Sequence, residues 1–270
     1  MAKQPIHQDR NFDDLAKRFQ KNIYGGLKGD IRLAVLARDF GEQIGVKPFG
    51  DAHKPLRILD AGGGQGQFSL QFAKAGHSVV ICDISAEMLK LAEQEVDEHH
   101  LQQQVKLIHC AIQDLPKFLP DHNCKFDIVL CHAVMEWMAE PQCLLKSLNA
   151  FLKPQGFISL TFYNLHSLIY KNLLRTNFKK IQDGDFGGSL GSLTPINPLY
   201  PEQVFHWLQA LPFHILATSG IRVFHDYIFN HEHRERDPKS VVELELKFSR
   251  QQPYQLLGRY IHVLAQKNNN

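Results

Sequence analysis

The feature that most constrains this chain is a glycine-rich segment that follows a short apolar run. Residues 56–66 read L-R-I-L-D-A-G-G-G-Q-G, with glycines at positions 62, 64 and 66. This pattern is typical of a buried strand that turns sharply into a helix, with its backbone too close to a ligand for side chains to intervene. A second apolar run, residues 79–83, ends in Asp83, where a nucleotide site would bind ribose hydroxyls. Together the two segments predict a nucleotide pocket.

The glycine spacing selects the kind of nucleotide. A dinucleotide fingerprint requires G-x-G-x-x-G, and here Gln67 or Ser69 stands where the last glycine is needed. Residues 60–66 instead read D-x-G-x-G-x-G, which resembles the first motif of class I S-adenosylmethionine-dependent methyltransferases. In that class the glycines pass under the amino acid part of the cofactor. The alternative, a tight strand-helix connection without a ligand, is disfavoured by Asp83 in the matching position.

Length and composition favour one soluble domain with a substantial core, since the chain has 270 residues. No run of about 18 apolar residues occurs, and the start, M-A-K-Q-P-I-H, is too polar for a secretory signal. We therefore expect a cytoplasmic protein without a membrane segment. The 5 cysteines form no C-x-x-C pair and the 15 histidines lack metal-site spacing, so we expect free thiols and no metal.

Charge is distributed unevenly along the chain, although the net charge is only +2. Residues 56–160 are acidic overall, whereas residues 1–55 and 161–270 each carry an excess of Lys and Arg. An anionic partner that approaches the flanking segments would fit this distribution, and solvated surface charge explains it about equally well. Charge alone therefore does not establish a nucleic acid partner.

The order of predicted elements indicates an α/β fold. Apolar residues recur at helical spacing over residues 11–24, and a second helix is predicted over about 31–44. Both precede the first strand, so we interpret residues 1–55 as an N-terminal helical lid. Over residues 56–160 strands and helices alternate, which implies parallel strands with a ligand at their carboxyl ends. The residues at those ends are Gly62, Asp83, Gln113 and His132.

Residues 161–270 differ in character, with two late strands predicted at about 215–224 and 259–266. The resemblance to class I methyltransferases implies that these strands complete a Rossmann-like, seven-stranded, mostly parallel sheet with helices on both faces and an antiparallel last strand. We therefore expect a single methyltransferase domain. In it, residues 56–160 form the cofactor-binding core and residues 161–270 form an acceptor-side insert with the closing strands.

Acceptor type leaves traces in methyltransferase sequences, because the protein mainly aligns the reacting groups and excludes water. An exocyclic adenine amine would require [DN]-P-P-[FYW] after the fourth strand, where this chain reads C-H-A-V at residues 131–134. Cys131 has the place of the nucleophile of pyrimidine C5 methylation, but its apolar neighbours favour a small packing residue. No dedicated base is evident. An acceptor already ionised at neutral pH, such as a carboxylate, needs none.

Several blocks outside the glycine segment carry a closer resemblance. They are N-I-Y-G at 22–25 with Lys28, Gly29 and Arg32, H-A-V at 132–134 with Glu136 and Trp137, F-Y-N at 162–164 with His166, R-V-F-H-D-Y at 222–227, and L-G-R-Y-I-H-V at 257–263. With D-A-G-G-G at 60–64, they resemble the bacterial tRNA 5-carboxymethoxyuridine methyltransferases from about Gln8 to Lys267. That family methylates the carboxylate of 5-carboxymethoxyuridine at the tRNA wobble position. The resemblance implies S-adenosylmethionine as cofactor, a methyl ester as product and the tRNA anticodon region as partner.

The resemblance also implies residues that bind the cofactor. These are Gly62 and Gly63 at the methionine part, Asp83 at the ribose, Ile112 and Gln113 at the adenine, and Arg32 and His132 elsewhere in the site. For the acceptor we extrapolate that aromatic faces stack an unpaired base and that arginines hold phosphate or carboxylate. The candidates are Tyr24, Tyr163, Arg222, His225, Arg259 and Tyr260. The alternatives are surface ion pairs for the arginines and core packing for Tyr163 and Tyr260.

One segment departs from the family pattern. Residues 183–193 read D-G-D-F-G-G-S-L-G-S-L, where the family can carry a cluster of lysines. Phosphate affinity would then be weaker or come from Lys171, Arg175, Lys179 and Lys180 just before the segment. Two other functions share the cofactor motifs. They are a small-molecule carboxyl or hydroxyl methyltransferase, and a non-catalytic tRNA-binding protein that retains the cofactor pocket.

Overall fold

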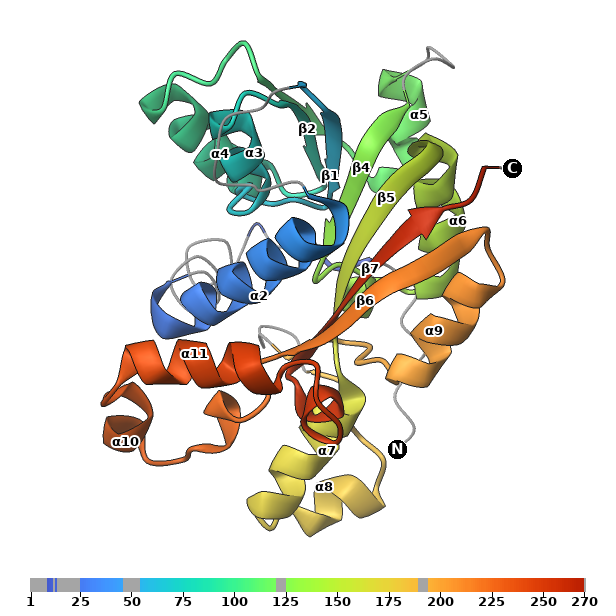
Figure 1. Cartoon of the computed structure of the whole chain (residues 1–270). Helices are drawn as coiled ribbons and strands as arrows, with labels where there is room; N and C mark the ends of the chain where they lie inside the picture. Colours follow the sequence, from blue (N-terminus) through green and yellow to red (C-terminus); the bar gives the residue numbers. More distant parts are fainter. Residues whose placement is uncertain are drawn as a thin grey trace.

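The computed structural model describes residues 9–11, 13, 25–45, 54–119, 125–188 and 194–269. The helix predicted over residues 11–24 lies almost entirely outside this part, as does Tyr24. The described chain contains a seven-stranded sheet with helices around it (Figure 1). This arrangement confirms the predicted fold class. Within the described ranges, no helix combines the length and apolar character needed to cross a bilayer.

The sheet has the strand order β3-β2-β1-β4-β5-β7-β6. β1 to β5 pair in parallel, whereas β7 is antiparallel to both of its neighbours, β5 and β6. The order changes direction between β1 and β4, the point at which open α/β sheets bind ligands at the carboxyl ends of their strands. The strands are β1 (Arg57–Ala61), β2 (Ser78–Asp83), β3 (Val105–His109), β4 (Phe126–His132), β5 (Leu152–Tyr163), β6 (Phe213–Ile221) and β7 (Tyr260–Lys267).

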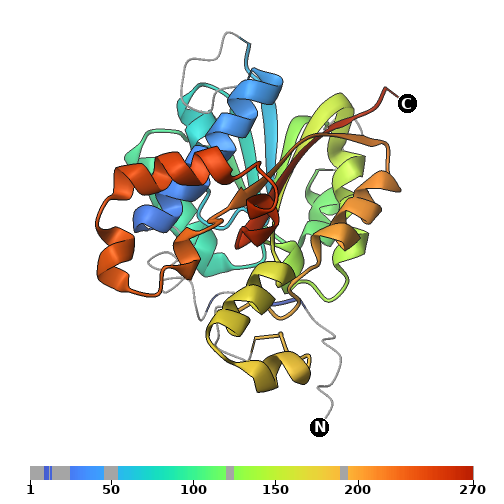
Figure 2. The ribbon, with the colours of Figure 1, turned by 60° about the horizontal axis from the view of Figure 1, so that its bottom comes forward.

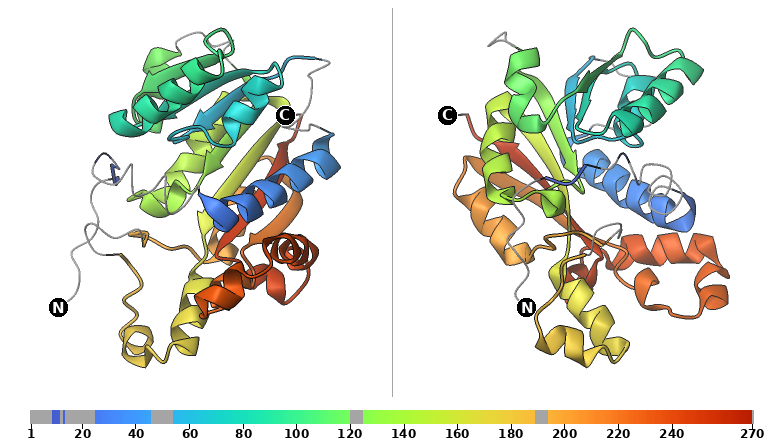
Figure 3. Two further views of the ribbon diagram at one scale, coloured as in Figure 1. Left: turned by 90° about the vertical axis from the view of Figure 1, so that its left-hand side faces the viewer. Right: turned by 180° about the vertical axis from the view of Figure 1, so that it is seen from behind.

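Helices cover both faces of the sheet. The α-helices are α2 (Gly26–Ile44), α3 (Ser69–Lys74), α4 (Ala86–Glu98), α5 (Leu115–Phe118), α6 (Pro141–Phe151), α7 (Leu165–Leu174), α8 (Phe178–Gln182), α9 (Pro201–Gln209), α10 (His231–Glu235) and α11 (Pro238–Phe248). Short 3-10 helices are η2 (Ile112–Asp114), η3 (Met135–Trp137), η4 (His225–Tyr227) and η5 (Tyr254–Leu257). Alternate strand residues face opposite layers. Figure 2 and Figure 3 show helices on both faces of the sheet. In β1, Ile58 belongs to the core with α2, α3 and α4, and Leu59 to the core with α5, α6 and α9.

The glycine segment continues as a loop for longer than predicted. The helix was expected to begin near Gly64, but α3 begins at Ser69. The reason is backbone conformation, because Gly62, Gly64 and Gly66 have φ angles of 72°, 57° and 73°, in the left-handed region that an α-helix excludes. Gly66 accordingly donates its N–H back to the carbonyl of Gly63 at 2.9 Å, as a turn does.

The described helix of the N-terminal segment, α2, packs against the sheet as a core layer, and the part of the predicted lid over residues 11–24 lies almost entirely outside the described residues. Leu36 and Phe40 of α2 are fully buried, and the Phe40 ring meets those of Phe68 and Phe72 at centroid distances of 5.4 and 5.5 Å. Helical periodicity indicates that a face is apolar but not which surface it covers. Removal of residues 1–40 would take this layer out of the core, so the sheet is not expected to fold without it.

The late strands bring distant residues to the carboxyl edge of the sheet. Because β7 runs against the other strands, its first residue, Tyr260, pairs with Tyr163 at the end of β5 and with Ile221 at the end of β6. Arg259, which precedes Tyr260, and Arg222, which follows Ile221, therefore lie at the same edge of the sheet. A third apolar cluster, with contributions from α2, α7 and α11, packs around these strand ends. Figure 1 shows α7 and α8 projecting beyond them.

Candidate active site at the carboxyl ends of the strands

The loop after β1 packs so closely that two of its positions admit only glycine. A Cβ atom added at Gly62 would lie 2.6 Å from Cγ2 of Val134, and one at Gly63 would lie 2.5 Å from Oδ2 of Asp60. Heavy atoms do not approach this closely without a shift of the surrounding structure. The loop therefore keeps a bare backbone at Gly62, which also lines the pocket described below.

Asp83, at the end of β2, is oriented by two backbone groups. The N–H of Gly64 donates to Oδ2 at 2.9 Å, and the N–H of Ser85 donates to Oδ1 at 2.8 Å. Burial raises the pKa of this carboxyl, and the two hydrogen bonds lower it. Each carboxylate oxygen has a further lone pair. The side chain can therefore accept two more hydrogen bonds in a fixed orientation, as a pair of ribose hydroxyls would require.

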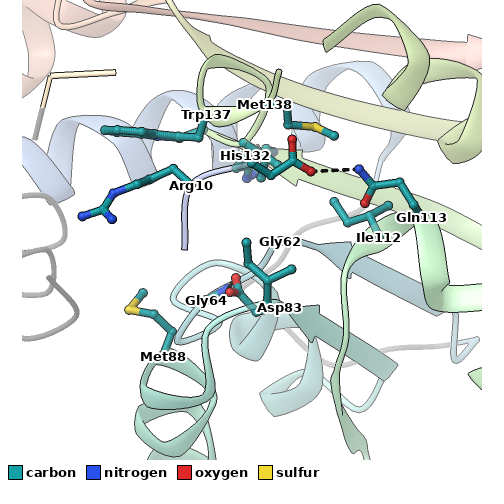
Figure 4. A pocket seen from close by; sticks show the side chains of 14 residues that line it. Arg10, Gly62, Gly64, Asp83, Met88, Ile112, Gln113, His132, Trp137 and Met138 are labelled. Atoms are coloured by element: carbon teal, nitrogen blue, oxygen red, sulfur yellow. Dashed lines mark hydrogen bonds between the residues drawn. The ribbon is translucent and has the colours of Figure 1, made fainter. Parts of the chain in front are cut away.

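A pocket of about 680 Å³, including its part open to solvent, lies beside Asp83 at the point where the strand order changes direction. In Figure 4, Asp83 and Met88 lie across the pocket from Trp137 and Met138. Mostly apolar walls with a few polar groups are typical of a small-molecule site and suit a nucleoside. The lining residues are Asp9, Arg10, Gly62, Gly64, Asp83, Ile84, Met88, Ile112, Gln113, His132, Ala133, Val134, Trp137 and Met138.

The residues that resemblance assigned to the cofactor lie around two adjoining cavities. The structure brings them together from α2, from the ends of β2 and β4, from the loop after β1 and from η2. Gly62 and His132 line both cavities. Gly62, Asp83, Ile112, Gln113 and His132 line the pocket, and Arg32, Gly62, Gly63 and His132 line a smaller cavity beside it.

Some lining residues were not found from the sequence. Asp9 reaches the pocket from the N-terminal segment, where its Oδ2 accepts a hydrogen bond from Nε2 of Gln113 at 2.9 Å, drawn dashed in Figure 4. Its Oδ1 accepts from the N–H of Ala139 at 3.1 Å. No motif or periodicity around Asp9 predicts these contacts. Met88 could have been predicted as a lining residue from the sequence, because it lies in the first turn of the helix that follows β2, the strand that ends in Asp83.

Three arginines and two tyrosines form a buried cluster at the ends of β5, β6 and β7. The rings of Tyr163 and Tyr260 meet edge to face, with centroids 5.3 Å apart. The guanidinium carbons of Arg32 and Arg222 lie 4.8 and 5.5 Å from the centroid of the Tyr260 ring. Nη1 of Arg259 donates to the hydroxyl of Tyr163 at 3.0 Å. Since Arg32, Arg222 and Arg259 are only 5%, 7% and 4% exposed, their charges require anionic or aromatic partners.

Asp226 supplies part of that compensation. Nε of Arg259 donates to Oδ2 of Asp226 at 2.8 Å, and Nη1 of Arg222 lies 3.5 Å from Oδ1. Burial alone would raise the pKa of Asp226, but Arg222, His225 and Arg259 hold it well below its usual range. The candidate His225 lies behind Asp226, with Nδ1 3.2 Å from Oδ1, and it lines neither cavity. Tyr24 is outside the described residues.

Glu136 is a buried carboxyl that the sequence did not single out as a site residue. It lies fully buried in η3, and neither carboxyl oxygen has a partner at hydrogen-bond geometry among the described residues. Burial raises the pKa of Glu136 to about 8, although the nearby Arg32 lowers it. A carboxyl group that stays protonated near neutral pH avoids most of the cost of burying a charge.

Replacing Glu136 with Gln should stabilise the protein increasingly as the pH rises. The folded carboxyl keeps its proton up to a pH of about 8, whereas the unfolded one ionises near its usual value, so ionisation favours unfolding between those pH values. The advantage of E136Q in unfolding free energy should therefore grow by roughly 1 to 3 kcal/mol between pH 5 and pH 8. Urea denaturation measures it, with the exposed Glu140→Gln as a control that should show no such trend. An advantage independent of pH would contradict a protonated Glu136.

Two chemical alternatives receive no support from the described residues. Cys131 is fully buried in β4, and burial raises the pKa of its thiol well above its usual range, so the nucleophilic thiolate is disfavoured. This placement agrees with the interpretation of Cys131 as a packing residue. In the described part of the chain, no group of three or more His, Cys, Asp or Glu side chains is placed to bind a metal.

Comparisons with known proteins identify the family. Residues 59–160 match the family described as Methyltransferase domain. The chain is 41% identical over 261 residues to the tRNA 5-carboxymethoxyuridine methyltransferase of Escherichia coli (strain K12), which covers 96% of this chain and 97% of that protein. It is 25% identical over 214 residues to Malonyl-[acyl-carrier protein] O-methyltransferase 2 of Ilyobacter polytropus, covering 78% of this chain and 74% of the other.

The fold is shared with solved methyltransferases. The plantazolicin methyltransferase BpumL in complex with S-adenosylhomocysteine superposes with a TM-score of 0.56 at 15% identity, covering 94% of this chain and 89% of that one. The methyltransferase family match and the E. coli relative support S-adenosylmethionine as the cofactor, as the glycine segment predicted. Since the identity to the E. coli protein extends over nearly the whole of both chains, this chain belongs to the tRNA 5-carboxymethoxyuridine methyltransferase family.

Proposed function

We propose that this enzyme transfers the methyl group of S-adenosylmethionine to the carboxylate of 5-carboxymethoxyuridine at the tRNA wobble position, forming the methyl ester. The observation that carries the proposal is the buried pair of Arg222 and Tyr260, because Tyr260 also contacts Arg32, which lines the cavity that adjoins the pocket. Buried guanidinium groups can hold a carboxylate, and an aromatic ring can stack an unpaired base. The E. coli relative, named for this nucleoside, supports the same acceptor.

The pocket residues fit the cofactor. Asp83 offers an oriented pair of acceptor oxygens, and the loop at Gly62 has no side chain between its backbone and the pocket. The apolar wall of Met88, Ile112 and Trp137 suits the faces of an adenine ring. We assign Asp83 to the ribose hydroxyls, Gly62 and Gly63 to the methionine part, Ile112 and Gln113 to the adenine, and Arg32 and His132 to the remainder of the site.

The chemistry makes few demands on the protein. S-adenosylmethionine, when bound, supplies an electrophilic methyl group on a positively charged sulfur. The side chains have to hold the acceptor carboxylate in line and exclude water, and no base is needed because the carboxylate is already ionised. Burial raises the pKa of Tyr260 to about 12, so its hydroxyl stays protonated and can donate a hydrogen bond to an anionic acceptor.

A cationic surface with exposed aromatic side chains lies beyond the arginine-tyrosine cluster, and we assign it to the phosphates of the anticodon arm. The guanidinium carbon of Arg175 lies 5.2 Å from the centroid of the Phe229 ring. Lys171 belongs to this surface and lies near the cluster. Burial and the charge of Arg259, a member of the cluster, lower the pKa of Lys171 to about 8. A tRNA substrate also agrees with the expected cytoplasmic location. The cations are Lys171, Arg175, Lys179 and Lys180, and the aromatic residues are Tyr170, Phe178 and Phe229, which are 38%, 54% and 47% exposed.

The reaction is tested by offering the purified protein two kinds of acceptor with labelled S-adenosylmethionine. Total tRNA from a strain that lacks the gene for this protein should become labelled. Nucleoside mass spectrometry should identify the product as the methyl ester of 5-carboxymethoxyuridine. Labelling of a metabolite extract but not of tRNA would favour a small-molecule methyltransferase. Binding of both tRNA and cofactor without turnover would favour a non-catalytic binding protein.

The affinity for tRNA should fall as salt rises, by about 0.7 logarithmic units per phosphate contact for each tenfold increase in salt. Replacing both Lys179 and Lys180 with Ala should reduce this slope by about 1.4 and leave cofactor affinity unchanged. Filter binding over a salt series measures the slope. The matched control replaces Lys90 and Lys117, exposed lysines on α4 and α5, and should keep the wild-type slope. A flat salt dependence of the wild type would remove the surface from the tRNA site.

A further inference from the structure

Four side chains form a hydrogen-bonded series that crosses the sheet from α2 to the pocket. Nδ1 of His262 lies 2.7 Å from Oδ2 of Asp39, and Nε2 of His262 lies 2.9 Å from Oγ of Ser159. Oγ of Ser159 lies 2.7 Å from Nε2 of His132. Asp39, His262 and Ser159 have no exposed surface, whereas His132 lines both cavities of the site. We call these four residues the Asp39–His132 network.

The outer end of the network carries a fixed negative charge. Asp39 accepts hydrogen bonds from Arg38, at 2.8 and 3.0 Å, and from Arg250, which also pairs with Glu42. Burial alone would raise the pKa of Asp39, but the hydrogen bond from His262 and the charge of Arg38 hold it well below its usual range. The carboxylate therefore stays ionised and is an acceptor only, so the Nδ1 atom of His262 has to carry a proton.

The proton positions along the rest of the network follow from this start. When His262 carries a single proton, on Nδ1, its Nε2 atom is an acceptor and accepts a hydrogen bond from the hydroxyl of Ser159. The oxygen of Ser159, having donated its proton, accepts from Nε2–H of His132. Burial and the charge of Arg32 hold the pKa of His132 well below its usual range, so its ring is neutral and Nδ1 keeps a lone pair.

We propose that Asp39, His262 and Ser159 are positioning residues that hold His132 as the Nε2–H tautomer, so that its Nδ1 accepts a hydrogen bond from the ammonium group of the cofactor's methionine part. The inference rests on the proposed cofactor site and assigns a direction to one of its hydrogen bonds. The ring of His132 is also held by packing, since it lies 5.6 Å from the Phe68 ring and 6.2 Å from the His262 ring. A histidine fixed in the opposite tautomer would present an N–H to the ammonium and repel it.

The tautomer is measured directly by nitrogen NMR of protein labelled in histidine, with the His132 signals assigned through a His132→Gln variant. In the wild type we expect protonated Nε2 and unprotonated Nδ1 at neutral pH. Asp39→Asn places an amide donor against His262 and should reverse every donor and acceptor along the network, as an Asp-to-Asn change does in a catalytic triad. Affinity for S-adenosylhomocysteine should then fall about tenfold or more by calorimetry.

Ser159→Ala provides a second variant, because it interrupts the network without removing a charge. It should weaken binding of S-adenosylhomocysteine about three- to tenfold and leave the tautomer of His132 mixed. Ser219→Ala is the matched control, since Ser219 is equally buried and accepts from Arg38 at 2.9 Å but does not lie between the histidines. It should leave tautomer and affinity unchanged.

An Nδ1–H tautomer in the wild type would overturn the proposal. Wild-type affinity in folded Ser159→Ala and Asp39→Asn variants would also overturn it. A merely structural role predicts lower thermal stability with an unchanged tautomer. None of these measurements contains tRNA, so they are independent of which acceptor the enzyme methylates.

Discussion

Asp83→Ala is expected to weaken S-adenosylmethionine binding at least tenfold. The substitution removes the carboxylate that accepts two hydrogen bonds from the ribose hydroxyls and leaves those hydroxyls without a partner. This loss costs on the order of 2 to 4 kcal/mol of binding free energy. The N–H groups of Gly64 and Ser85 would also lose their acceptor, so the glycine loop would be held less firmly. Calorimetry with S-adenosylmethionine and with S-adenosylhomocysteine measures the effect, and circular dichroism checks that the variant is folded.

A matched control for this substitution is Asp114→Ala. Asp114 ends the 3-10 helix η2 beside the pocket, but its side chain is 48% exposed and pairs with Lys117. Its removal should leave cofactor affinity within about twofold, as is usual for exposed ion pairs. Unchanged affinity in a folded Asp83→Ala variant would remove Asp83 from the cofactor site.

Arg32→Lys is expected to raise the cofactor Michaelis constant about tenfold or more, and Arg32→Ala should raise it further. Lysine keeps the charge but lacks the planar guanidinium group, which can hold a carboxylate through two hydrogen bonds. It also loses the contact with Tyr260, whose ring centroid lies 4.8 Å from the guanidinium carbon of Arg32. The fold should persist, because the neighbouring Glu136 carboxyl can remain protonated without the arginine. Initial rates at varied cofactor and varied tRNA concentrations measure the two constants separately.

The outcome also decides on which side of the site Arg32 acts. A rise in the Michaelis constant for tRNA, with that for the cofactor unchanged, would place Arg32 at the acceptor and contradict its assignment to the cofactor site. Arg236→Lys, on an exposed residue beyond α10, is the control and should have wild-type kinetics. Wild-type kinetics in both Arg32 variants would show that Arg32 only packs the helix.

The cofactor loop could be predicted because its requirements are local. Gly62 and Gly64 have positive φ angles, which few residue types other than glycine adopt. The N–H of Gly64 also donates to Asp83, so the glycine pattern and the acidic residue after the next strand correspond directly to the geometry. The alternation of strands and helices likewise predicted β1 to β5, since a parallel strand needs a crossover before the next one. Element ends were less certain, as the start of α3 at Ser69 shows.

The role of α2 could not be obtained in this way. Its apolar periodicity is the same whether the helix closes over a ligand or packs on a sheet. Only the contacts of Phe40 with Phe68 and Phe72 show that it is a core layer. Likewise, Tyr163 and Arg259 are ordinary residues in the sequence, and only the reversed direction of β7 brings them within a hydrogen bond of each other.

The sequence by itself determined the nucleotide loop, the alternation of parallel strands with helices and, through its similarity to a known family, the cofactor. These follow from short-range backbone constraints and from residue types that only certain turns accept. Only the tertiary structure decided which polar side chains meet. Asp39 and His262 are 223 positions apart and carry no shared pattern, yet burial places them 2.7 Å from each other. Such contacts depend on how helices and strands pack, because a buried polar group has to find its partner wherever the fold provides one.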